Sequence, residues 1–192
     1  PIAGQRLLDV GCGNGAFLLK AFEAGWQTTG VDPDPNSVEK AQSQGLDVHL
    51  GSLAHFDGQA ELFDAVTLSH VIEHTHDPKA TLAEVFRLLK PGGTLYIDTP
   101  NIQSRGFSTF GKNWRGIETP RHLVLFSLPG IRNLLLRSGF RNIDFKHRRL
   151  VSRGMFLSSL RVSLGFSPYA NKPKKMPFML SLKLCVLRTP YP

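Results

Sequence analysis

Residues 7–15 read LLDVGCGNG, an apolar run that leads into three glycines at alternate positions. The run is short and almost wholly apolar, which is typical of a strand buried in a parallel sheet. The glycines lack Cβ atoms, so a ligand can lie against bare backbone in the loop. Apolar residues at 17, 18 and 22 then follow a helical period, and the start of such a helix presents free amide groups. The stretch predicts a strand, a ligand-binding loop and a helix.

Strands and helices alternate along the first 146 residues. Asp34-Pro35 and Asp77-Pro78 each pair an N-cap with a proline at the first helical position, and Ser127 is a third cap. Further strands are expected at residues 28–31, 46–50, 63–68, 94–98 and 140–145. This alternation predicts an α/β fold, a Rossmann-like doubly wound and mostly parallel sheet with helices on both faces.

The charge of the chain is divided unevenly between its halves. Residues 1–100 hold 6 Lys or Arg against 13 Asp or Glu, whereas residues 101–192 hold 17 against 2. Such asymmetry favours an anionic partner for the second half, namely an anionic substrate, a membrane surface or nucleic acid. No RNA-binding module is recognisable, so nucleic acid is the weakest of the three. A basic solvated face without a specific partner is the alternative.

Composition indicates a single globular domain. A chain of 192 residues suits one domain with a full core. Its two cysteines, Cys12 and Cys185, are too few for a disulfide framework and favour a reducing compartment, so we expect the cytoplasm. No apolar run approaches the roughly 20 residues that cross a bilayer. Because the chain opens at Pro1 directly before a strand, we expect a preceding segment in the natural protein.

Asp9, at the end of the first strand, discriminates between two kinds of ligand. Residues 11–16 satisfy the looser G-x-G-x-x-A form of the dinucleotide fingerprint, so an NAD-binding protein is an alternative. A carboxylate facing the loop repels a pyrophosphate, however, and suits an ammonium group. S-adenosylmethionine carries an ammonium and a sulfonium but no phosphate, and it fits this loop better.

These residues resemble the class I S-adenosylmethionine-dependent methyltransferases. Residues 7–15 are similar to the first motif of that family, and residues 30–32 resemble the acidic end of its second strand. Residues 63–66 and 89–93 resemble its fourth strand and the turn before its fifth. The ordered matches within residues 5–100 are more specific than one glycine-rich loop.

The resemblance implies a set of cofactor contacts. Asp32 would hold the ribose hydroxyls, Pro33 would pack on the adenine, and Ser52 and Leu53 lie where the family contacts the adenine, although Asp is more usual than Ser there. We place His70, directly after the fourth strand, beside the cofactor. The residues expected to bind S-adenosylmethionine are Asp9, Gly11, Cys12, Gly13, Gly15, Asp32, Pro33, Ser52, Leu53 and His70.

Residues 70–74 read HVIEH, which matches the H-x-x-E-H signature of some zinc peptidases. That motif needs both histidines on one helix face, but here a predicted strand ends at residue 68 and Asp77-Pro78 begins the next helix. We therefore expect a loop or a single turn. Glu73-His74 followed by Asp77-Pro78 resembles the ubiquinone-biosynthesis O-methyltransferase group, some members of which bind a divalent metal through an acidic residue, a Glu and this His. His70 stands at the acidic position, so we predict no metal.

The acceptor side is expected to involve His74 and His122. The resemblance places His74 near the methyl acceptor, and we interpret it as a general base, which helps when the acceptor is a hydroxyl. A structural histidine bonded to a loop is the alternative. Residues 114–123 resemble a segment that lies over the active site in the same group, so His122 and Trp114 are expected to line the acceptor pocket.

We therefore predict a methyltransferase that acts on the oxygen of a small-molecule or lipid-like acceptor, with C- or N-methylation open. The alternatives are a non-catalytic, cofactor-binding partner subunit and an NAD-binding Rossmann protein. Residues 1–146 are predicted to form the S-adenosylmethionine-binding domain, with 100–126 as a substrate-side loop. Residues 147–192 are predicted to be a basic segment that faces the acceptor or a membrane and adds a last edge strand at 182–187.

An amphipathic helix is expected within this basic segment. Residues 153–164 place apolar side chains beside Arg153 and Arg161, a pattern that suits an anionic membrane surface. We therefore expect a cytoplasmic protein that associates peripherally with a membrane.

Overall fold

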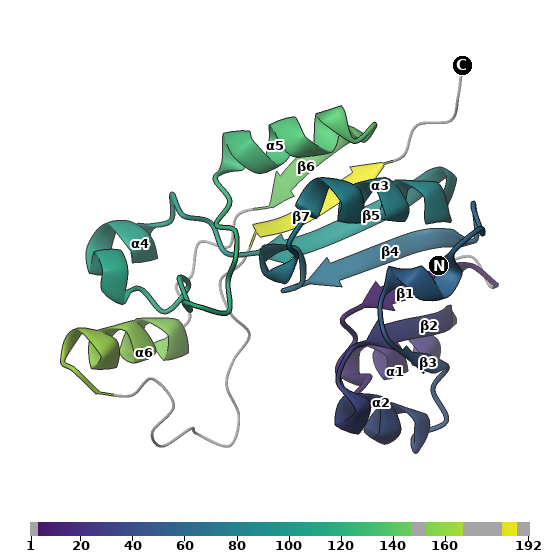
Figure 1. Cartoon of the computed structure of the whole chain (residues 1–192), viewed down its shortest axis with the longest axis horizontal. Coiled ribbons are helices and arrows are strands. Elements are labelled where there is room, and N and C mark those ends of the chain that lie inside the picture. The colour runs from purple at the N-terminus through teal and green to yellow at the C-terminus, as the bar shows by residue number, and fades with distance from the viewer. Residues whose placement is uncertain (1–3, 147–152, 167–181, 188–192) are drawn as a thin grey trace.

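The computed structural model describes residues 4–146, 153–166 and 182–187, which form one sheet flanked by helices (Figure 1). The strands are β1 (Arg6–Val10), β2 (Gln27–Asp32), β3 (Val48–Leu50), β4 (Phe63–Ser69), β5 (Leu89–Thr99), β6 (Arg141–Lys146) and β7 (Leu182–Leu187). The helices are α1 (Ala16–Glu23), α2 (Pro35–Gln42), α3 (Pro78–Leu88), α4 (Arg105–Phe110), α5 (Leu128–Arg137) and α6 (Arg153–Ser163). Short 3₁₀ turns are η1 (Leu53–Phe56), η2 (Ile72–His74) and η3 (Gly111–Asn113). None of the described helices is long and apolar enough to cross a membrane.

The strands lie in the order β3-β2-β1-β4-β5-β7-β6. Strands β1 to β5 pair in parallel, whereas β7 is antiparallel to both of its neighbours. The order reverses between β1 and β4, because the chain moves outward to β3 before it returns to the other side of β1. The predicted doubly wound, mostly parallel fold is confirmed. Open sheets of this kind bind ligands outside the carboxyl ends of the strands at such a reversal.

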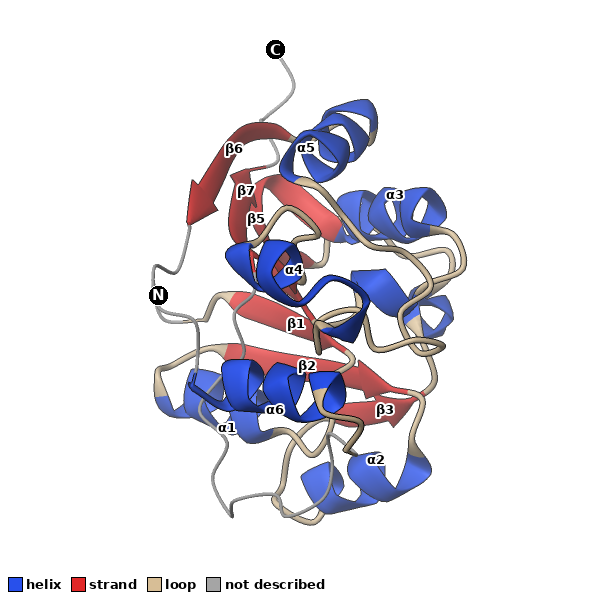
Figure 2. Ribbon diagram, turned by 90° about the vertical axis from the view of Figure 1, so that its left-hand side faces the viewer, coloured by secondary structure: helices blue, strands red, loops and turns tan. Residues whose placement is uncertain are grey.

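Both faces of the sheet are covered by helices, as predicted. Leu7 of β1 packs in one buried cluster with residues of α1 and α2, whereas Leu8 and Val10 belong to a second cluster with α3 and α5. Side chains of a strand alternate between faces, so this division follows directly from the sequence LLDV. Helices α3 and α5 lie together on one side of the strands (Figure 2).

The helix starts follow the predicted caps. The Asp34 side chain accepts a hydrogen bond from the amide of Asn36, and Asp77 accepts one from Ala80. The prolines that follow both caps occupy the first helical position, where no amide hydrogen is needed. Because α3 begins just after Asp77, residues 72–74 form the single turn η2, as the sequence predicts.

The predicted substrate-side loop, residues 100–126, contains the short helix α4 and the turn η3. Its ends meet, because Ile102 donates a backbone hydrogen bond to Phe126 (2.9 Å). Helix α4 contacts α6 through the rings of Phe110 and Phe156, whose centroids are 5.2 Å apart. The two helices lie together off one end of the sheet (Figure 1). A helix of six residues is too short to give a readable period, which explains why the sequence suggested only a loop.

The last predicted strand forms at residues 182–187, but it does not lie at the edge of the sheet. Strand β7 lies between β5 and β6, and β6 takes the edge position instead. An apolar run indicates a strand but carries no information on its neighbours, which explains the error. Because β7 pairs with β5, part of the predicted C-terminal segment belongs to the same sheet as residues 1–146.

Candidate active site

A cavity of about 680 Å³ opens at the carboxyl ends of β1, β2 and β4, beside the reversal of strand order. The predicted site residues in its wall are Gly11, Asp32, Pro33, Ser52, Leu53, His70 and His74. The predicted residues outside its wall are Asp9, Cys12, Gly13, Gly15 and His122. One cavity thus brings six of the ten expected cofactor contacts together with His74 from the expected acceptor side.

The glycine loop bends tightly over the end of β2. The amide of Gly11 donates to the carbonyl of Val31 (2.8 Å), and Gly11 has a φ of 69°, which L side chains rarely adopt. A Cβ on Gly11 would also lie 2.5 Å from a methyl group of Val71. Only glycine fits this position.

The carboxylate of Asp32 ties the loop to the end of β2. One oxygen accepts from the amide of Gly13 (2.7 Å) and the other from the amide of Asp34 (2.9 Å). A carboxylate offers about four acceptor positions, so Asp32 can still accept from hydroxyl groups of a ligand. The side chain is nearly buried yet contributes to the cavity wall, which suits the predicted ribose contact.

Asp9 lies beneath the loop instead of facing the cavity. Its side chain is buried and accepts a hydrogen bond from the hydroxyl of Thr67 on the neighbouring strand β4. Burial raises the pKa of Asp9 to about 7, although the bond from Thr67 acts in the opposite direction. The predicted effect of Asp9 on a cationic ligand would therefore act through the loop, without direct contact at the wall.

Cys12 and Gly15 shape the loop from behind. Cys12 is buried in the cluster beneath α1, and burial, followed by the charges of Asp9 and Asp32, raises the pKa of its thiol to about 12. A thiol with so high a pKa is unreactive at neutral pH. Gly15 has a φ of 76° and precedes α1, and a Cβ there would lie 2.4 Å from Leu46.

His70 and Glu73 form a bonded pair at the end of β4. The Nδ1 atom of His70 lies 3.1 Å from Oε1 of Glu73, and the hydroxyl of Thr99 donates to Oε2 (2.9 Å). Burial alone would lower the pKa of His70, but the bond to Glu73 and the charge of Asp98 raise it. Burial alone would raise the pKa of Glu73, but the bond from His70 lowers it. Both shifts favour the imidazolium–carboxylate form.

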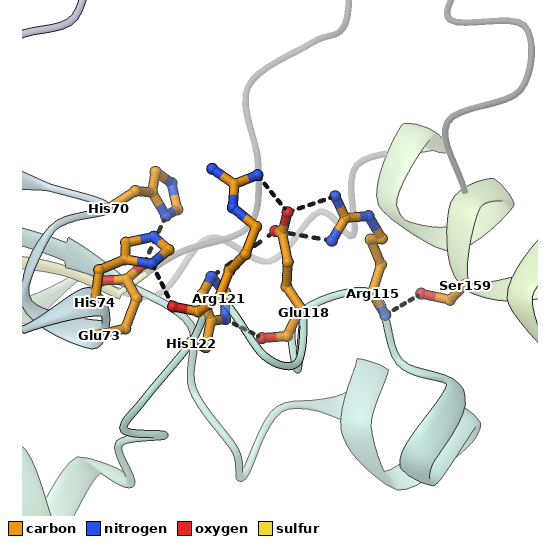
Figure 3. A network of polar contacts seen from close by, with 9 residues as sticks. His70, Glu73, His74, Arg115, Glu118, Arg121, His122 and Ser159 are labelled. Carbon is orange, nitrogen blue, oxygen red and sulfur yellow. Dashed lines mark hydrogen bonds and ion pairs between the residues drawn. The ribbon is translucent and has the colours of Figure 1, made fainter. Parts of the chain in front are cut away.

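His74 is held by a hydrogen bond to the backbone of Arg121. Its Nδ1 atom lies 2.8 Å from the carbonyl oxygen of Arg121 (Figure 3). A carbonyl can only accept, so this contact requires a proton on Nδ1 and leaves the lone pair of the neutral ring on Nε2. A histidine in the cavity wall with a lone pair on Nε2 can accept a proton from a bound hydroxyl.

His122 packs behind His74 and away from the cavity wall. The two rings meet edge to face, with centroids 4.8 Å apart, and Nδ1 of His122 donates to the carbonyl of Gly116 (2.9 Å). Burial lowers the pKa of His122, so the ring is neutral near pH 7. Its Nε2 atom approaches Glu118 Oε2 at 3.8 Å, which for a neutral ring is no ion pair. Trp114 is buried too, and neither ring belongs to the described cavity wall.

Several wall residues were not expected from the sequence. Asp57, Thr75 and Glu84 also line the cavity. Thr75 lies next to a predicted residue and could have been found by proximity. Arg121 of the wall belongs to residues 114–123, which the sequence predicts to lie over the active site. Asp57 and Glu84 follow only from the folded arrangement of η1 and α3.

The metal site implied by the resemblance does not fit this chain. It needs an acidic residue where His70 stands, and the His70 ring instead donates to Glu73. Among the described residues, donor atoms of Glu73, His74 and His122 lie within 4.8 Å of one another. This set offers one carboxylate and two imidazoles, whereas Mg²⁺ prefers oxygen ligands. The set therefore does not suit Mg²⁺.

The cavity wall fits S-adenosylmethionine better than a dinucleotide. Near β2 and η1 the charged residues of the described wall are the carboxylates Asp32 and Asp57, and the wall residue Arg121 lies beside His74. Carboxylates favour a cationic ligand and oppose a pyrophosphate. Asp32 has acceptor capacity for ribose hydroxyls, and Leu53 offers an apolar surface for a base. The NAD-binding alternative gains no support from this arrangement.

Comparison with known proteins identifies the family. A family profile described as a methyltransferase domain matches residues 1–144. A ubiquinone biosynthesis O-methyltransferase from Xanthomonas oryzae pv. oryzae is 38% identical over 114 residues, covering 56% of this chain and 48% of that protein. The enzyme of the same name from Albidiferax ferrireducens is 32% identical over 115 residues, covering 56% and 46%. The chain thus spans about half the length of the curated relatives that it matches.

Solved structures share the fold at low sequence identity. A methyltransferase from Methanosarcina mazei has a TM-score of 0.72 at 19% identity, covering 100% of this chain and 95% of the other. Phosphoethanolamine N-methyltransferase 2 from Haemonchus contortus, in complex with S-adenosyl-L-methionine, has a TM-score of 0.70 at 19% identity, covering 100% and 50%. Together with the family match, these similarities confirm the predicted methyltransferase fold. The chain belongs to the methyltransferase domain family.

Proposed function

We propose that this chain transfers a methyl group from S-adenosylmethionine to the hydroxyl oxygen of a small-molecule or lipid-like acceptor. One observation supports this most strongly: a single cavity joins the glycine loop and Asp32 to His74, whose free lone pair is on Nε2. The matched relatives are named as O-methyltransferases of ubiquinone biosynthesis, which favours oxygen over nitrogen or carbon as the acceptor atom. A non-catalytic partner subunit would not need a proton acceptor in this wall.

The reaction requires the chain to position two ligands and remove one proton. When bound, S-adenosylmethionine supplies a methyl group whose bond to sulfur breaks as the acceptor oxygen attacks its carbon. Asp32 and the loop at Gly11 hold the cofactor end, and His74 Nε2 takes the proton of the acceptor hydroxyl. Holding the reacting atoms in line can supply on the order of 7–11 kcal/mol. Removal of the proton by a positioned base typically adds about 10²–10⁴-fold in rate.

His74→Ala is expected to lower methyl transfer by roughly 100-fold or more, since the base is removed, and to leave the cofactor dissociation constant nearly unchanged. The measurement is transfer of labelled methyl groups to a catechol and, separately, to a primary amine. His76→Ala is the matched control, because His76 is exposed and outside the cavity wall. An unchanged rate in His74→Ala would remove the base assignment, and transfer to the amine alone would reject an oxygen acceptor.

We further propose that α6 rests on an anionic lipid surface, and that the protein is cytoplasmic and peripheral to the membrane. Five large apolar side chains of this region are exposed: Phe156, Leu157, Leu160, Leu164 and Phe166. The sequence from residue 145 onward contains no acidic residue. Apolar side chains combined with an excess of basic residues are typical of helices that bind anionic membrane surfaces. A lipid-like acceptor would be reached from such a surface.

Co-sedimentation with vesicles tests this proposal. We expect binding to phosphatidylglycerol-containing vesicles and little binding to phosphatidylcholine alone. The double variant Leu157→Glu, Leu164→Glu should bind at least about tenfold more weakly, because each buried leucine contributes roughly 1.5–3 kcal/mol. Phe22→Glu on α1 is the control, since Phe22 is equally exposed but lies on another helix. Indifference to lipid charge would contradict the proposal.

A further inference from the structure

Glu118 lies in the middle of residues 114–123, the segment whose Arg121 carbonyl is bonded to His74. Its carboxylate accepts from both terminal nitrogens of Arg115, at 2.8 and 2.9 Å, and from Nη1 of Arg121 at 3.0 Å (Figure 3). The side chain is only 12% exposed, so these are charge-assisted bonds of a largely buried carboxylate. Glu118 thus holds the side chain of Arg115, three residues before it, and that of Arg121, three residues after it.

The backbone of Glu118 also forms hydrogen bonds within this segment. Its carbonyl accepts from the amides of Arg121 (2.8 Å) and His122 (3.3 Å), which closes a tight turn. Glu118 itself has a φ of 40°, a left-handed conformation that costs a non-glycine residue roughly 1–3 kcal/mol. The side-chain bonds to the two arginines offset this cost and keep the turn closed.

The closed turn determines where the carbonyl of Arg121 lies. Both the amide and the guanidinium of Arg121 are bonded to Glu118. The carbonyl of the same residue accepts from His74 Nδ1 at 2.8 Å. A neutral imidazole exchanges between two tautomers, and the bond that one nitrogen makes selects between them. The carbonyl of Arg121 selects the tautomer with the proton on Nδ1.

The segment is attached to the rest of the molecule at both ends, independently of the Glu118 carboxylate. The amide of Arg115 donates to the buried hydroxyl of Ser159 on α6 (3.0 Å), and the amides of Leu123 and Val124 donate to the carbonyl of Glu73. Trp114 is buried between Gly106 and Gly116, at both of which a Cβ would lie 2.4 Å from its ring. Loss of the carboxylate should therefore relax the turn locally and leave the fold intact.

We propose that Glu118 is a positioning residue that keeps His74 in the tautomer able to accept a proton from the methyl acceptor. It acts through the backbone carbonyl of Arg121 and lies outside the described cavity wall. This inference rests on the proposed function for its role in catalysis. The tautomer itself can be measured on the free protein without any acceptor.

The test is a long-range ¹H–¹⁵N correlation spectrum of the histidine-labelled chain, with His74 assigned from the signals that His74→Ala removes. The wild-type protein should show a protonated Nδ1 and an unprotonated Nε2 for His74. In Glu118→Gln, which keeps the side-chain size but loses the charge, the two nitrogen shifts should move toward a common average. Asp64→Asn is the matched control: it removes a carboxylate that also accepts from an amide and a lysine, but far from His74.

The outcomes separate the two proposals. Averaged His74 shifts in Glu118→Gln, with the thermal midpoint within a few degrees of wild type, support the positioning role, and transfer to the catechol probe should then fall on the order of ten- to 100-fold. An unchanged tautomer in Glu118→Gln overturns the inference. If Glu118→Gln fails to fold, Arg115→Met tests the same turn and should shift the His74 signals in the same direction. Failure of the base assignment appears only in the transfer rate of His74→Ala and leaves the tautomer result standing.

Discussion

Asp32→Ala is expected to weaken binding of S-adenosylmethionine strongly. The carboxylate accepts from the amides of Gly13 and Asp34, so its removal loosens the glycine loop at Gly13, while the backbone bond from Gly11 to Val31 remains. It also removes the acceptor that is predicted to hold the ribose hydroxyls. Hydrogen bonds to a charged group contribute about 1.5–3 kcal/mol each, so loss of two such bonds to the ribose hydroxyls should weaken binding by at least about 100-fold.

Isothermal titration with S-adenosylmethionine and, separately, with NAD measures this effect. The wild-type chain should bind the sulfonium cofactor in the micromolar range and NAD not detectably. Asp34→Ala is the matched control, because Asp34 caps α2 outside the cavity wall and its amide bond to Asp32 survives the substitution. The control should lose some stability from the missing cap but keep its affinity. Wild-type affinity in Asp32→Ala would refute the ribose contact.

The fold was largely predictable because local signals agree with the tertiary structure. The apolar run before Gly11 and the cap-plus-proline pairs at Asp34 and Asp77 place elements that the structure confirms. Each signal acts within a few residues and needs no knowledge of distant partners. The position of β7 between β5 and β6 depends on pairing across a long separation in sequence, which no local pattern contains.

The candidate site was predictable only in part, for the same reason. Gly11 directly follows β1, Asp32 ends β2 and His74 lies in the turn η2 after β4, and they reach one cavity because these strands end at the same edge of the sheet. The position of Asp9 beneath the loop depends on Thr67 of a neighbouring strand, and the hold on His74 depends on a turn 47 residues away at Arg121. Such contacts arise from packing and could not be derived from spacing.

Asp9→Asn is expected to stabilise the free protein at alkaline pH. Burial raises the pKa of Asp9 from 3.8 to about 7, so between these values the folded chain binds a proton that the unfolded chain has lost. Stability therefore falls as pH rises through this window, and the full cost of about 4 kcal/mol is reached above pH 7. Asparagine is neutral throughout and can still accept from Thr67. The variant should match the wild type near pH 4 and exceed it by a few kcal/mol at pH 8.

Urea unfolding at a series of pH values measures this difference. Asp64→Asn serves as a control of opposite sign: burial would raise the pKa of Asp64, but the bonds from the Arg6 amide and Lys90 lower it, so this variant should lose stability at neutral pH. Equal pH profiles for Asp9→Asn and wild type would show that Asp9 is ionised without cost.

A cationic ligand would stabilise the ionised form of the Asp9 carboxylate and so offset the cost of ionising it. S-adenosylmethionine binding near pH 7 should therefore release protons from the wild type and not from Asp9→Asn, visible as a buffer-dependent binding enthalpy.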